Sequence, residues 1–434
     1  MIADIFYVLI TMLFWLSVIF LIIGIIKLSL NKGYALPLKG SFKRFFDFWL
    51  KETSKKITVL KIILFGLVVR LITFLIANYI LTINNLDNSI INTFHSFVRW
   101  DASHYLTLAE FWYTYQYNGQ NVFLVFFPLQ PFLIRFVGTI IGSYFAAGFV
   151  VSITAYLAAL CFMYFLARID FSVKVSWLSI LFISVFTHSF FFGTPHTESI
   201  FLLSTVVTLY FIRKHSWILA GITGAIASSS RAVGIVLFGT ALIELFIHYR
   251  MFKMVLRRKW KLFFHVIFFK AGWLCLMPVG LGIYLLINWA VSGDPLRFVY
   301  FQENHWHTSF QYFVTTFRYQ FSLIEHFQSY RAARNFFVIP NIYSVILCVV
   351  LVFYASIKRF NSSMIAYSLV YIMISFSFTW LLSGGRYAAA LAPIFIYLAE
   401  FASKSKQRIY VILFSFVIGL VLILRAYLLG AYVM

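Results

Sequence analysis

The feature that most constrains this chain is a series of apolar runs, each close to the length that a membrane requires of a helix. A hydrocarbon core of about 30 Å needs about 20 consecutive apolar residues, and runs near that length recur along the whole sequence. Inside a bilayer the backbone must satisfy its own hydrogen bonds, which a helix does within one segment. The sequence therefore predicts an all-α polytopic membrane protein. No long polar segment could form a second domain, so residues 1–434 are expected to be one membrane-embedded domain.

The apolar runs predict about 12 transmembrane helices. The predicted helices cover residues 5–30, 58–82, 145–167, 176–194, 197–213, 217–231, 233–249, 262–290, 336–357, 363–382, 388–402 and 408–430. The first run is too long for the apolar part of a signal peptide and has no basic flank before it, so we expect a retained helix. Cys161, Cys275 and Cys348 fall within apolar runs without CxxC spacing and are interpreted as small core residues.

The formal net charge of +22 raises the question of nucleic-acid binding. The positions of the charges argue against it, because lysines and arginines cluster in short connectors between the apolar runs. No basic stretch accompanies a nucleic-acid fold signature. A basic face also suits anionic lipids. We therefore expect membrane lipids, and no nucleic acid, among the partners.

Four basic connectors set the predicted orientation. They contain Lys32, Lys39, Lys43, Arg44, Lys51, Lys55 and Lys56; Arg213 and Lys214; Arg250, Lys253, Arg257, Arg258, Lys259 and Lys261; and Lys404, Lys406 and Arg408. Counting the predicted crossings places all four on one side, which is cytoplasmic by the positive-inside rule. The sequon at Asn361 falls on that side and gives no sign of a secretory lumen. A compact chain without organelle signals predicts the plasma membrane of a prokaryote.

Two long connectors then lie on the external face. The first external region, 83–144, begins with a stretch that holds Arg99 and three acids, and continues into an apolar stretch, 123–144, with two prolines and Arg135. We expect that apolar stretch to form a helix at the membrane interface. The second external region, 291–335, is rich in aromatic residues and histidine. Large loops on one face, without an internal repeat, favour surface chemistry over symmetric alternating access.

Acidic residues are few enough to consider one by one, because a general base on the external face must come mainly from them. Asp47, Glu52 and Asp170 lie among basic residues of cytoplasmic connectors and are interpreted as solvated counter-charges. Asp4 is at the terminus, Glu244 is in the cytoplasmic half of a helix, and Glu400 is near a helix end. The external acids are Asp87, Asp101, Glu110, Glu198, Asp294, Glu303 and Glu325.

Asp101 has the most suggestive surroundings of these acids. Its neighbours are Arg99, Trp100 and His104. An aspartate between an indole and an imidazole can be partly desolvated, which tunes a carboxylate toward base chemistry. If the following residues are helical, Asp101 shares one face with His104 and Tyr105, and Glu110 lies further along. The alternative is an aspartate that caps the start of an interfacial helix.

A second polar cluster joins two predicted helices by a tight external turn within residues 187–199. His196 and Glu198 of this turn could line a polar site. The alternative is a capped turn, with Thr197 or Ser199 as the helix cap.

Arg231 and Arg386 are predicted at or near membrane depth. An arginine there is costly unless it is paired, so it usually faces a cavity or an anionic ligand. Guanidinium groups suit bidentate phosphate contacts, and two glycines before Arg386 would allow the backbone to lie close to a ligand. The alternative for each arginine is that its side chain extends to the lipid head groups.

The second external region contains Gln302, His305, Trp306 and His307. Trp306, with Gln302 and His305 as polar neighbours, could stack on a sugar ring. Two histidines without a carboxylate or cysteine set are weak evidence for a metal. We therefore expect no metal site and no other cofactor.

Taken in order, these clusters resemble the PIG-V family (GPI mannosyltransferase 2-like), the second mannosyltransferase of GPI-anchor synthesis and its prokaryotic relatives. The matching residues are Arg99, Trp100, Asp101 and His104; Phe126 to Pro131 with Arg135; His196 to Ser199; Ser230, Arg231 and Gly234; Gly293 to Pro295 with Gln302 and Trp306; and Arg386, Tyr387 and Pro393. They span about residues 95–395, and the ordered set is more specific than any one piece. The chain differs at Gln130, where a tyrosine is more usual, and at Ala388–Ala390, where larger apolar residues are expected.

The resemblance implies a GT-C glycosyltransferase architecture with its active site on the non-cytoplasmic face. It implies a polyprenyl-phosphate sugar donor, typically carrying mannose, and we expect a glycan or glycolipid acceptor. By motif position, Asp101 would be the catalytic base and Arg386 would contact the donor phosphate. Glu198 and Arg231 would lie in the donor or acceptor cavity. The other residues expected to bind substrate are Arg99, Trp100, His104, Glu110, His196, Gln302, His305, Trp306 and Tyr387.

The resemblance therefore implies an inverting hexosyltransferase in which arginines stabilise the departing phosphate. One alternative is a lipid flippase or small-molecule transporter. It would need ionisable residues at mid-membrane, which only Glu244 approaches, and repeat symmetry. Another alternative is a non-enzymatic scaffold or subunit of a larger complex, whose function would not depend on Asp101, Arg231 and Arg386.

Overall fold

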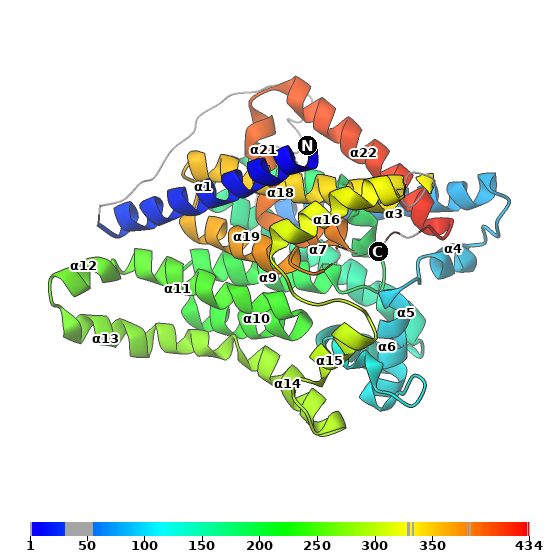
Figure 1. The fold of residues 1–434 in the computed structure, drawn as a ribbon, viewed down its shortest axis with the longest axis horizontal. Helices are drawn as coiled ribbons and strands as arrows, with labels where there is room; N and C mark the ends of the chain where they lie inside the picture. The colour runs from blue at the N-terminus through cyan, green and yellow to red at the C-terminus, as the bar shows by residue number, and fades with distance from the viewer. Residues whose placement is uncertain are drawn as a thin grey trace.

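The computed structural model describes residues 2–30, 55–327, 330–331, 334–379, 381, 383–431 and 433, with side chains described from residue 5 onward. Helices account for nearly all secondary structure in these residues (Figure 1). The β pairings among them are two isolated bridges, Tyr117 with Gln120 and Phe310 with Phe378. The all-α class predicted from the apolar runs is confirmed.

Among the described residues, five helices are long and apolar enough to cross a membrane. They are α1 (Ile2–Leu30), α3 (Lys55–Ile83), α7 (Tyr144–Asp170), α18 (Ile339–Ile357, preceded by the π-helical turn Arg334–Val338) and α22 (Lys406–Leu428). A sixth candidate is a bent pair, Trp260–Leu276 with Val279–Ser292, whose parts meet at 42°. By length and composition this is an integral membrane protein. The predicted number of about 12 spans is not confirmed.

Six further apolar helices in the described part of the chain have only 10–17 residues. They are α6 (Leu129–Ile141), α8 (Val173–Val185), α10 (Trp217–Ser230), α11 (Val236–His248, continuing the 3₁₀ turn Ala232–Ile235), α19 (Ser362–Ser375) and α21 (Ala392–Ser403). A helix of about 14 residues is about 21 Å long, which is less than the hydrocarbon core of about 30 Å. Apolar composition alone could not show where these helices stop.

The end of α8 shows why one predicted helix is too long. Residues 176–194 were predicted as one helix, but α8 ends at Val185 and a 3₁₀ turn, η3 (Ser189–Gly193), follows. Arg70 of α3 is buried against this break and donates hydrogen bonds to the carbonyls of Ser184 at 2.9 Å and Ser189 at 2.6 Å. A buried side chain from a distant helix therefore satisfies carbonyls that a continuing helix would have bonded itself.

The remaining helical elements are short. They are α4 (Ile90–Ser96), α5 (Asp101–Phe111), η1 (Trp112–Thr114), η2 (Val122–Val125), α9 (Glu198–Arg213), α12 (Met251–Leu256), α13 (Trp260–Phe269), η5 (Ala271–Leu276), α14 (Val279–Ser292), α15 (Arg297–Asn304), α16 (Phe313–His326) and α20 (Gly384–Ala390). The two predicted external regions are thus largely helical. The helix predicted over 262–290 is broken into α13, η5 and α14, and the one predicted over 363–382 ends at Ser375.

Helix α9 packs between α7 and α10, and α8 packs on α21 (Figure 1). Close approach is required where α10 meets η5, because a Cβ on Gly221 would lie 2.1 Å from the carbonyl oxygen of Trp273. A glycine is the only residue that fits that contact without moving the backbone. This packing fixes the start of α9 and the end of α10, which both carry residues of the candidate site.

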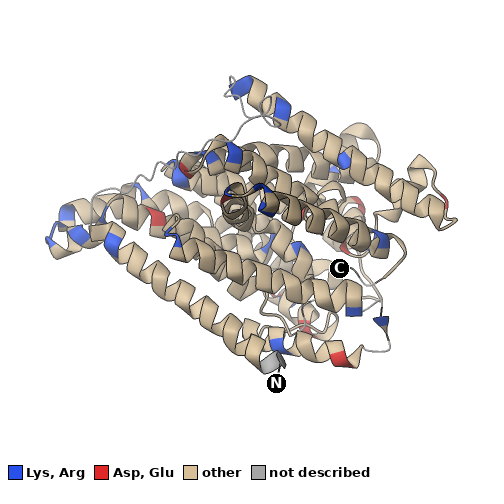
Figure 2. Cartoon of the chain, turned by 90° about the horizontal axis from the view of Figure 1, so that it is seen from above, with Lys and Arg blue, Asp and Glu red and all other residues tan. Residues whose placement is uncertain are grey.

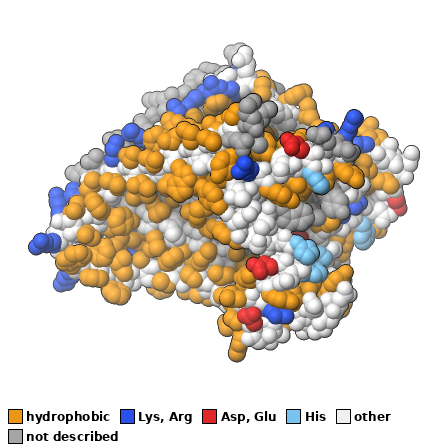
Figure 3. Space-filling view, in the orientation of Figure 1, with side chains coloured by type: hydrophobic (Ala, Val, Ile, Leu, Met, Phe, Trp, Pro, Cys, Tyr) orange, Lys and Arg blue, Asp and Glu red, His pale blue; other side chains and the backbone are white. Residues whose placement is uncertain are grey.

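The molecular surface is largely apolar, as Figure 3 shows over the bundle. Figure 2 shows lysine and arginine grouped at the end that carries α12 and α13. The first basic connector is described only at Lys55 and Lys56, so its other predicted members lie outside the described residues, and so does the side chain of Asp4. Those members are Lys32, Lys39, Lys43, Arg44 and Lys51, with the acids Asp47 and Glu52. The sidedness of the membrane stays a prediction.

Candidate functional site

Four charged side chains from distant parts of the sequence meet at one place, which we call the four-charge network. Arg386 of α20 donates from Nη1 to Oδ2 of Asp101 at 2.9 Å and from Nε to Oε1 of Glu198 at 2.7 Å. Arg231, which follows α10, donates from Nη2 to the same Oε1 of Glu198. Its Nε donates to Oγ1 of Thr197 at 2.9 Å. Two carboxylates and two guanidinium groups therefore form one connected unit with a formal charge of zero.

The local backbone explains how the two acids reach this point. Asp101 is the first residue of α5, and Trp100 occupies the cap position with φ at 55° and without a side-chain cap bond. The interpretation of Asp101 as a helix cap is therefore wrong, because its carboxylate turns to Arg386 instead. Glu198 likewise begins α9. Thr197 precedes it without capping it, since its hydroxyl accepts the hydrogen bond from Arg231.

The members of the network differ in exposure. The side chain of Glu198 has 0% of its surface exposed and that of Arg386 has 3%. Arg231 is 16% exposed and Asp101 is 32% exposed. The interpretation that both arginines extend to lipid head groups is wrong, because each is bonded to a carboxylate inside the protein. Glu198 is the innermost member of the network, and Asp101 is at its accessible edge.

A glycine and two rings hold Arg386 in place. Its guanidinium carbon lies 4.9 Å from the ring centre of Phe191 in η3, which allows a cation–π contact. The preceding residue, Gly385, lies against His188, whose ring atoms would be 2.1–2.3 Å from any added Cβ. The sequence predicted a close approach at this glycine, but to a ligand. Within the protein, the approach is to a buried histidine.

Two buried acceptors in the site have no hydrogen-bond partner among the described residues: Oε2 of Glu198 and Nε2 of His196. The hydroxyl of Thr194 donates to the carbonyl of Phe191 at 2.9 Å and lies 2.8 Å from Nδ1 of His196. Since that hydroxyl has one proton, Nδ1 must carry the hydrogen of the histidine and Nε2 must be the acceptor. A group that satisfies both acceptors has to supply hydrogens, as hydroxyl groups do.

The charge states at the site follow from burial and from the arginines. Burial, the largest single effect, would raise the pKa of Asp101, but the charge and hydrogen bond of Arg386, together with His196, bring the pKa below its usual value. Burial, reinforced by Arg386, lowers the pKa of His196 to about 3. Burial also lowers the pKa of His104, so both histidines are neutral near pH 7. At that pH the site holds an ionised carboxylate, Asp101, whose basicity Arg386 weakens, and neither histidine adds a positive charge.

An aromatic wall stands beside Asp101 on α5. The ring of His104 lies 4.7 Å from Phe123, 5.3 Å from Phe126 and 5.6 Å from Trp306. His305 in turn contacts Trp306 with ring centres 5.1 Å apart. The first and second predicted external regions therefore meet here. His104 of the first region lies against Trp306 of the second, and His305 contacts Trp306, although the sequence analysis treated these residues as two separate clusters.

Other predicted site residues lie outside the network. Arg99 donates to the carbonyls of Ser96 and Leu428, which ties its loop to the end of α22. The side chain of Glu110 is exposed at the far end of α5. Gln302 donates to the hydroxyl of Thr308 within its own loop.

Two aromatic residues of the predicted site, Tyr387 and Trp100, lie beside the network. Tyr387 lies 5.9 Å from the guanidinium carbon of Arg231. Trp100 packs with the apolar cluster beside α22. Sequence reasoning missed His188 and Phe191, which lie in a segment predicted as continuous helix, and it considered Thr197 only as a cap. No group of three or more His, Cys, Asp or Glu in the described residues is arranged to hold a metal ion.

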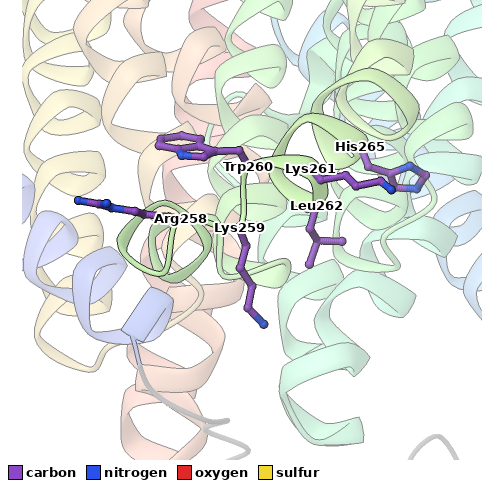
Figure 4. Close-up of a pocket in the computed structure, with 6 residues that line it drawn as sticks. All are labelled: Arg258, Lys259, Trp260, Lys261, Leu262 and His265. Atoms are coloured by element: carbon purple, nitrogen blue, oxygen red, sulfur yellow. The ribbon is translucent and has the colours of Figure 1, made fainter.

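Two cavities of the described structure lie away from the network. One, of about 510 Å³, is lined by Arg258, Lys259, Trp260, Lys261, Leu262 and His265. Figure 4 shows that these side chains point in different directions and do not converge on one point. The other, of about 330 Å³, is mostly apolar and lies between α3, α4, α7 and η3 with Arg70 on its wall. Phe190 and Gly193 of η3 line it, so η3 separates this cavity from Arg386.

Comparison with known proteins adds little to this geometry. No protein-family model and no curated protein sequence matches the chain. The chain is similar to the archaeal oligosaccharyltransferase AglB from Archaeoglobus fulgidus, solved with an inhibitory peptide and a dolichol-phosphate, at 13% identity and a TM-score of 0.44 over 85% of this chain. A second Archaeoglobus fulgidus oligosaccharyltransferase structure, tethered to an acceptor peptide, gives 14% and 0.42, again over 85%. The chain spans only 56% and 55% of those chains. A likeness at this level assigns neither a fold family nor an activity.

Proposed function

We propose that this protein is a membrane glycosyltransferase with a GT-C architecture, related to the PIG-V family that its motifs resemble. It moves a hexose, with mannose as the expected sugar, from a polyprenyl-phosphate donor to a hydroxyl of a glycan or glycolipid acceptor. The observation that carries the proposal is the four-charge network. It joins an accessible carboxylate, Asp101, to two arginines that suit a phosphate.

The reaction is a single displacement. The acceptor oxygen attacks the anomeric carbon while the bond from that carbon to the phosphate oxygen breaks, and the electron pair leaves with the lipid phosphate. Asp101 takes the proton of the acceptor hydroxyl. Arg386 and Arg231 stabilise the negative charge that grows on the leaving phosphate. One displacement inverts the anomeric configuration, and none of these steps requires a metal.

The surroundings of the network suit a sugar. Nε2 of His196 and Oε2 of Glu198 are buried acceptors that hydroxyl groups of a hexose could satisfy. His104 and Trp306 supply ring faces beside Asp101 on which a sugar ring can stack. The network lies at the end of α9 opposite to Arg213, which belongs to a basic connector. That position agrees with a site on the non-cytoplasmic face of a prokaryotic plasma membrane, as the positive-inside rule predicts.

The test is hexose transfer by the purified protein in lipid nanodiscs. Polyprenyl-phosphate mannose with a radiolabelled sugar serves as donor, and a glycolipid extract from the source membrane serves as acceptor. We expect label to move to the acceptor with inverted configuration, and Asp101→Asn to abolish the transfer. Glu303→Gln is the matched control, because Glu303 is an exposed carboxylate of the predicted second external region. Substrate flux into proteoliposomes without glycosyl transfer would support the transporter alternative and overturn the proposal.

A further inference from the structure

The two carboxylates of the four-charge network are held unequally. Glu198 is fully buried, and its Oε1 accepts hydrogen bonds from both arginines. Asp101 is bonded to Arg386 alone and has 32% of its side chain exposed. The arginines are therefore anchored from the buried side, and Asp101 is the one carboxylate of the network that can turn toward solvent.

The network has no cation to spare for an additional anion. Its two guanidinium groups are already matched by two carboxylates. The adjacent histidine, His196, is neutral because burial lowers its pKa to about 3. Arg99 is bonded to backbone carbonyls instead. An anion that enters the site therefore makes the network net negative unless one of the carboxylates moves away from its arginine.

Only one of the two carboxylates can separate from its arginine at a small cost in free energy. Separating Glu198 from its arginines would leave an unpaired charge in the interior, which typically costs several kcal/mol. Separating Asp101 from Arg386 leaves a carboxylate that water can reach. A phosphate oxygen makes charge-assisted hydrogen bonds with a guanidinium at least as well as a carboxylate does.

We propose that the phosphate of the lipid-linked donor displaces Asp101 from Arg386, so that the catalytic base is released only when the donor is in place. This inference rests on the proposed function and adds an order of events to it. Glu198 acts as the positioning residue, because it holds both arginines while the exchange takes place at the accessible edge.

The exchange changes the base chemistry of Asp101. Paired with Arg386, the carboxylate has a lowered pKa and is a weak base. Beside a phosphate anion and away from the guanidinium, its pKa rises, and it accepts the proton of the acceptor hydroxyl more readily. Without donor, the site holds a weakened base and does not activate an acceptor or a water molecule.

The titratable and charged groups around Asp101 come from several elements. They are His104 and Tyr105 on α5, His196 before α9, Glu198 at its start, Arg231 after α10, Arg386 and Tyr387 on α20, Tyr427 on α22, and Arg99, which precedes α5 and bonds to the end of α22. The neutral histidines and the tyrosines carry no charge near pH 7. The charge on Asp101 is therefore set mainly by Arg386, which is the contact that the phosphate takes.

The protonation of Asp101 can be followed in the wild-type protein without any transfer reaction. A carbodiimide with an amine modifies protonated carboxyl groups, and mass spectrometry of the peptide that contains Asp101 gives its rate at each pH. The probe is farnesyl phosphate, a short polyprenyl monophosphate, and farnesol is the uncharged control. We expect farnesyl phosphate to move the labelling midpoint of Asp101 upward by about one pH unit, a tenfold change in proton affinity. Farnesol should not move it, and the midpoint of Glu303 should stay constant.

Each outcome decides a different point. An unchanged Asp101 midpoint at saturating farnesyl phosphate, or no binding of that probe, overturns the inference. Hexose transfer that proceeds while the midpoint stays fixed overturns it and leaves the proposed function intact. A shifted midpoint in a protein that transfers no hexose supports the exchange at Arg386 and contradicts the proposed function.

Discussion

The two ends of α9 each lie beside a buried glutamate that pairs with arginine, and they differ in one respect. Beyond the C-terminal end, Oε1 of Glu244 accepts from Arg213 at 2.9 Å and lies 3.3 Å from Nε2 of His215, and Oε2 accepts from Asn361 at 3.2 Å. At the N-terminal end, Glu198 receives both of its hydrogen bonds on Oε1 and none on Oε2 within the described residues.

This difference separates a structural cluster from a candidate site. In the Glu244 cluster both carboxylate oxygens accept hydrogen bonds, as buried acceptors in a folded interior are expected to do. The Glu198 cluster leaves acceptors unused and ends in an accessible carboxylate. A partly satisfied buried network costs stability, so its presence is better explained by binding than by folding. The two clusters are separated by the length of α9, about 24 Å for its 16 residues at 1.5 Å each.

The strongest test of the comparison uses two aspartates that are equally exposed. Asp101 pairs with Arg386 and Asp170 pairs with Arg213, and each has 32% of its side chain exposed. We expect Asp101→Asn to lower the rate of hexose transfer by about 10²- to 10⁴-fold, the range for loss of a general base. Asp170→Asn should change the rate less than twofold. Initial rates with radiolabelled donor measure both, and equal losses in the two variants would contradict the distinction.

The second test displaces Arg386 without changing any charge. In Gly385→Ala the new Cβ would meet the ring of His188, so α20 has to shift and the guanidinium moves with it. We expect a loss of transfer of about 10- to 100-fold, since misplacement by about 1 Å can have that effect. Gly239→Ala is the control, because no atom lies within 4 Å of its added Cβ. Rates for both variants, corrected for folded protein, give the comparison.

The third test addresses the cluster at the other end of α9. Glu244→Gln should lower the free energy of unfolding by about 2 kcal/mol, the scale of a hydrogen bond to a charged group. Transfer by the folded protein should be unchanged, because Glu244 does not touch the four-charge network. Thermal unfolding in nanodiscs measures the first effect and donor turnover the second. A loss of turnover without a loss of stability would show that the two ends are not independent.

The smallest expected effect is the dependence of stability on pH. The pKa of Asp101 is lowered in the folded protein, so its contribution to stability is complete above the unfolded value near 3.9. That contribution is lost as the pH falls toward the folded pKa. The difference in melting temperature between wild type and Asp101→Asn should therefore be constant from pH 5 to 7 and shrink below about pH 4. A melting-temperature difference that grows on acidification would mean that the pKa of Asp101 is raised, not lowered, in the folded protein.

The helices could be predicted because a bilayer imposes a local rule on composition. The prediction of helix ends failed where an end depends on residues that are distant in the sequence. The end of α8 depends on Arg70, more than 100 residues earlier in the chain, which bonds the carbonyl of Ser184. Several apolar helices are also shorter than a membrane span. An apolar run therefore predicted where a helix lies more reliably than where it ends.

The candidate site shows a similar division. Scarcity of acids and the ordered motifs identified Asp101, Glu198, Arg231 and Arg386 as candidates. Their pairing could not be predicted, because no local pattern shows which guanidinium meets which carboxylate. His188 was missed for the same reason, since its contact with Gly385 exists only after α20 packs on η3. Glu110 was included for its position on α5, yet its side chain lies away from the network.

The pairing of Arg386 with Asp101 also has a consequence for biosynthesis. The two residues are 285 positions apart in the chain, and Arg386 is made long after Asp101, Glu198 and Arg231. Until the ribosome reaches that codon, Glu198 has a single cation and Asp101 has none from this network. The four-charge network is therefore one of the last parts of the protein that can be completed, and the nascent chain cannot bring Asp101 and both arginines into their final arrangement while earlier helices are still entering the membrane.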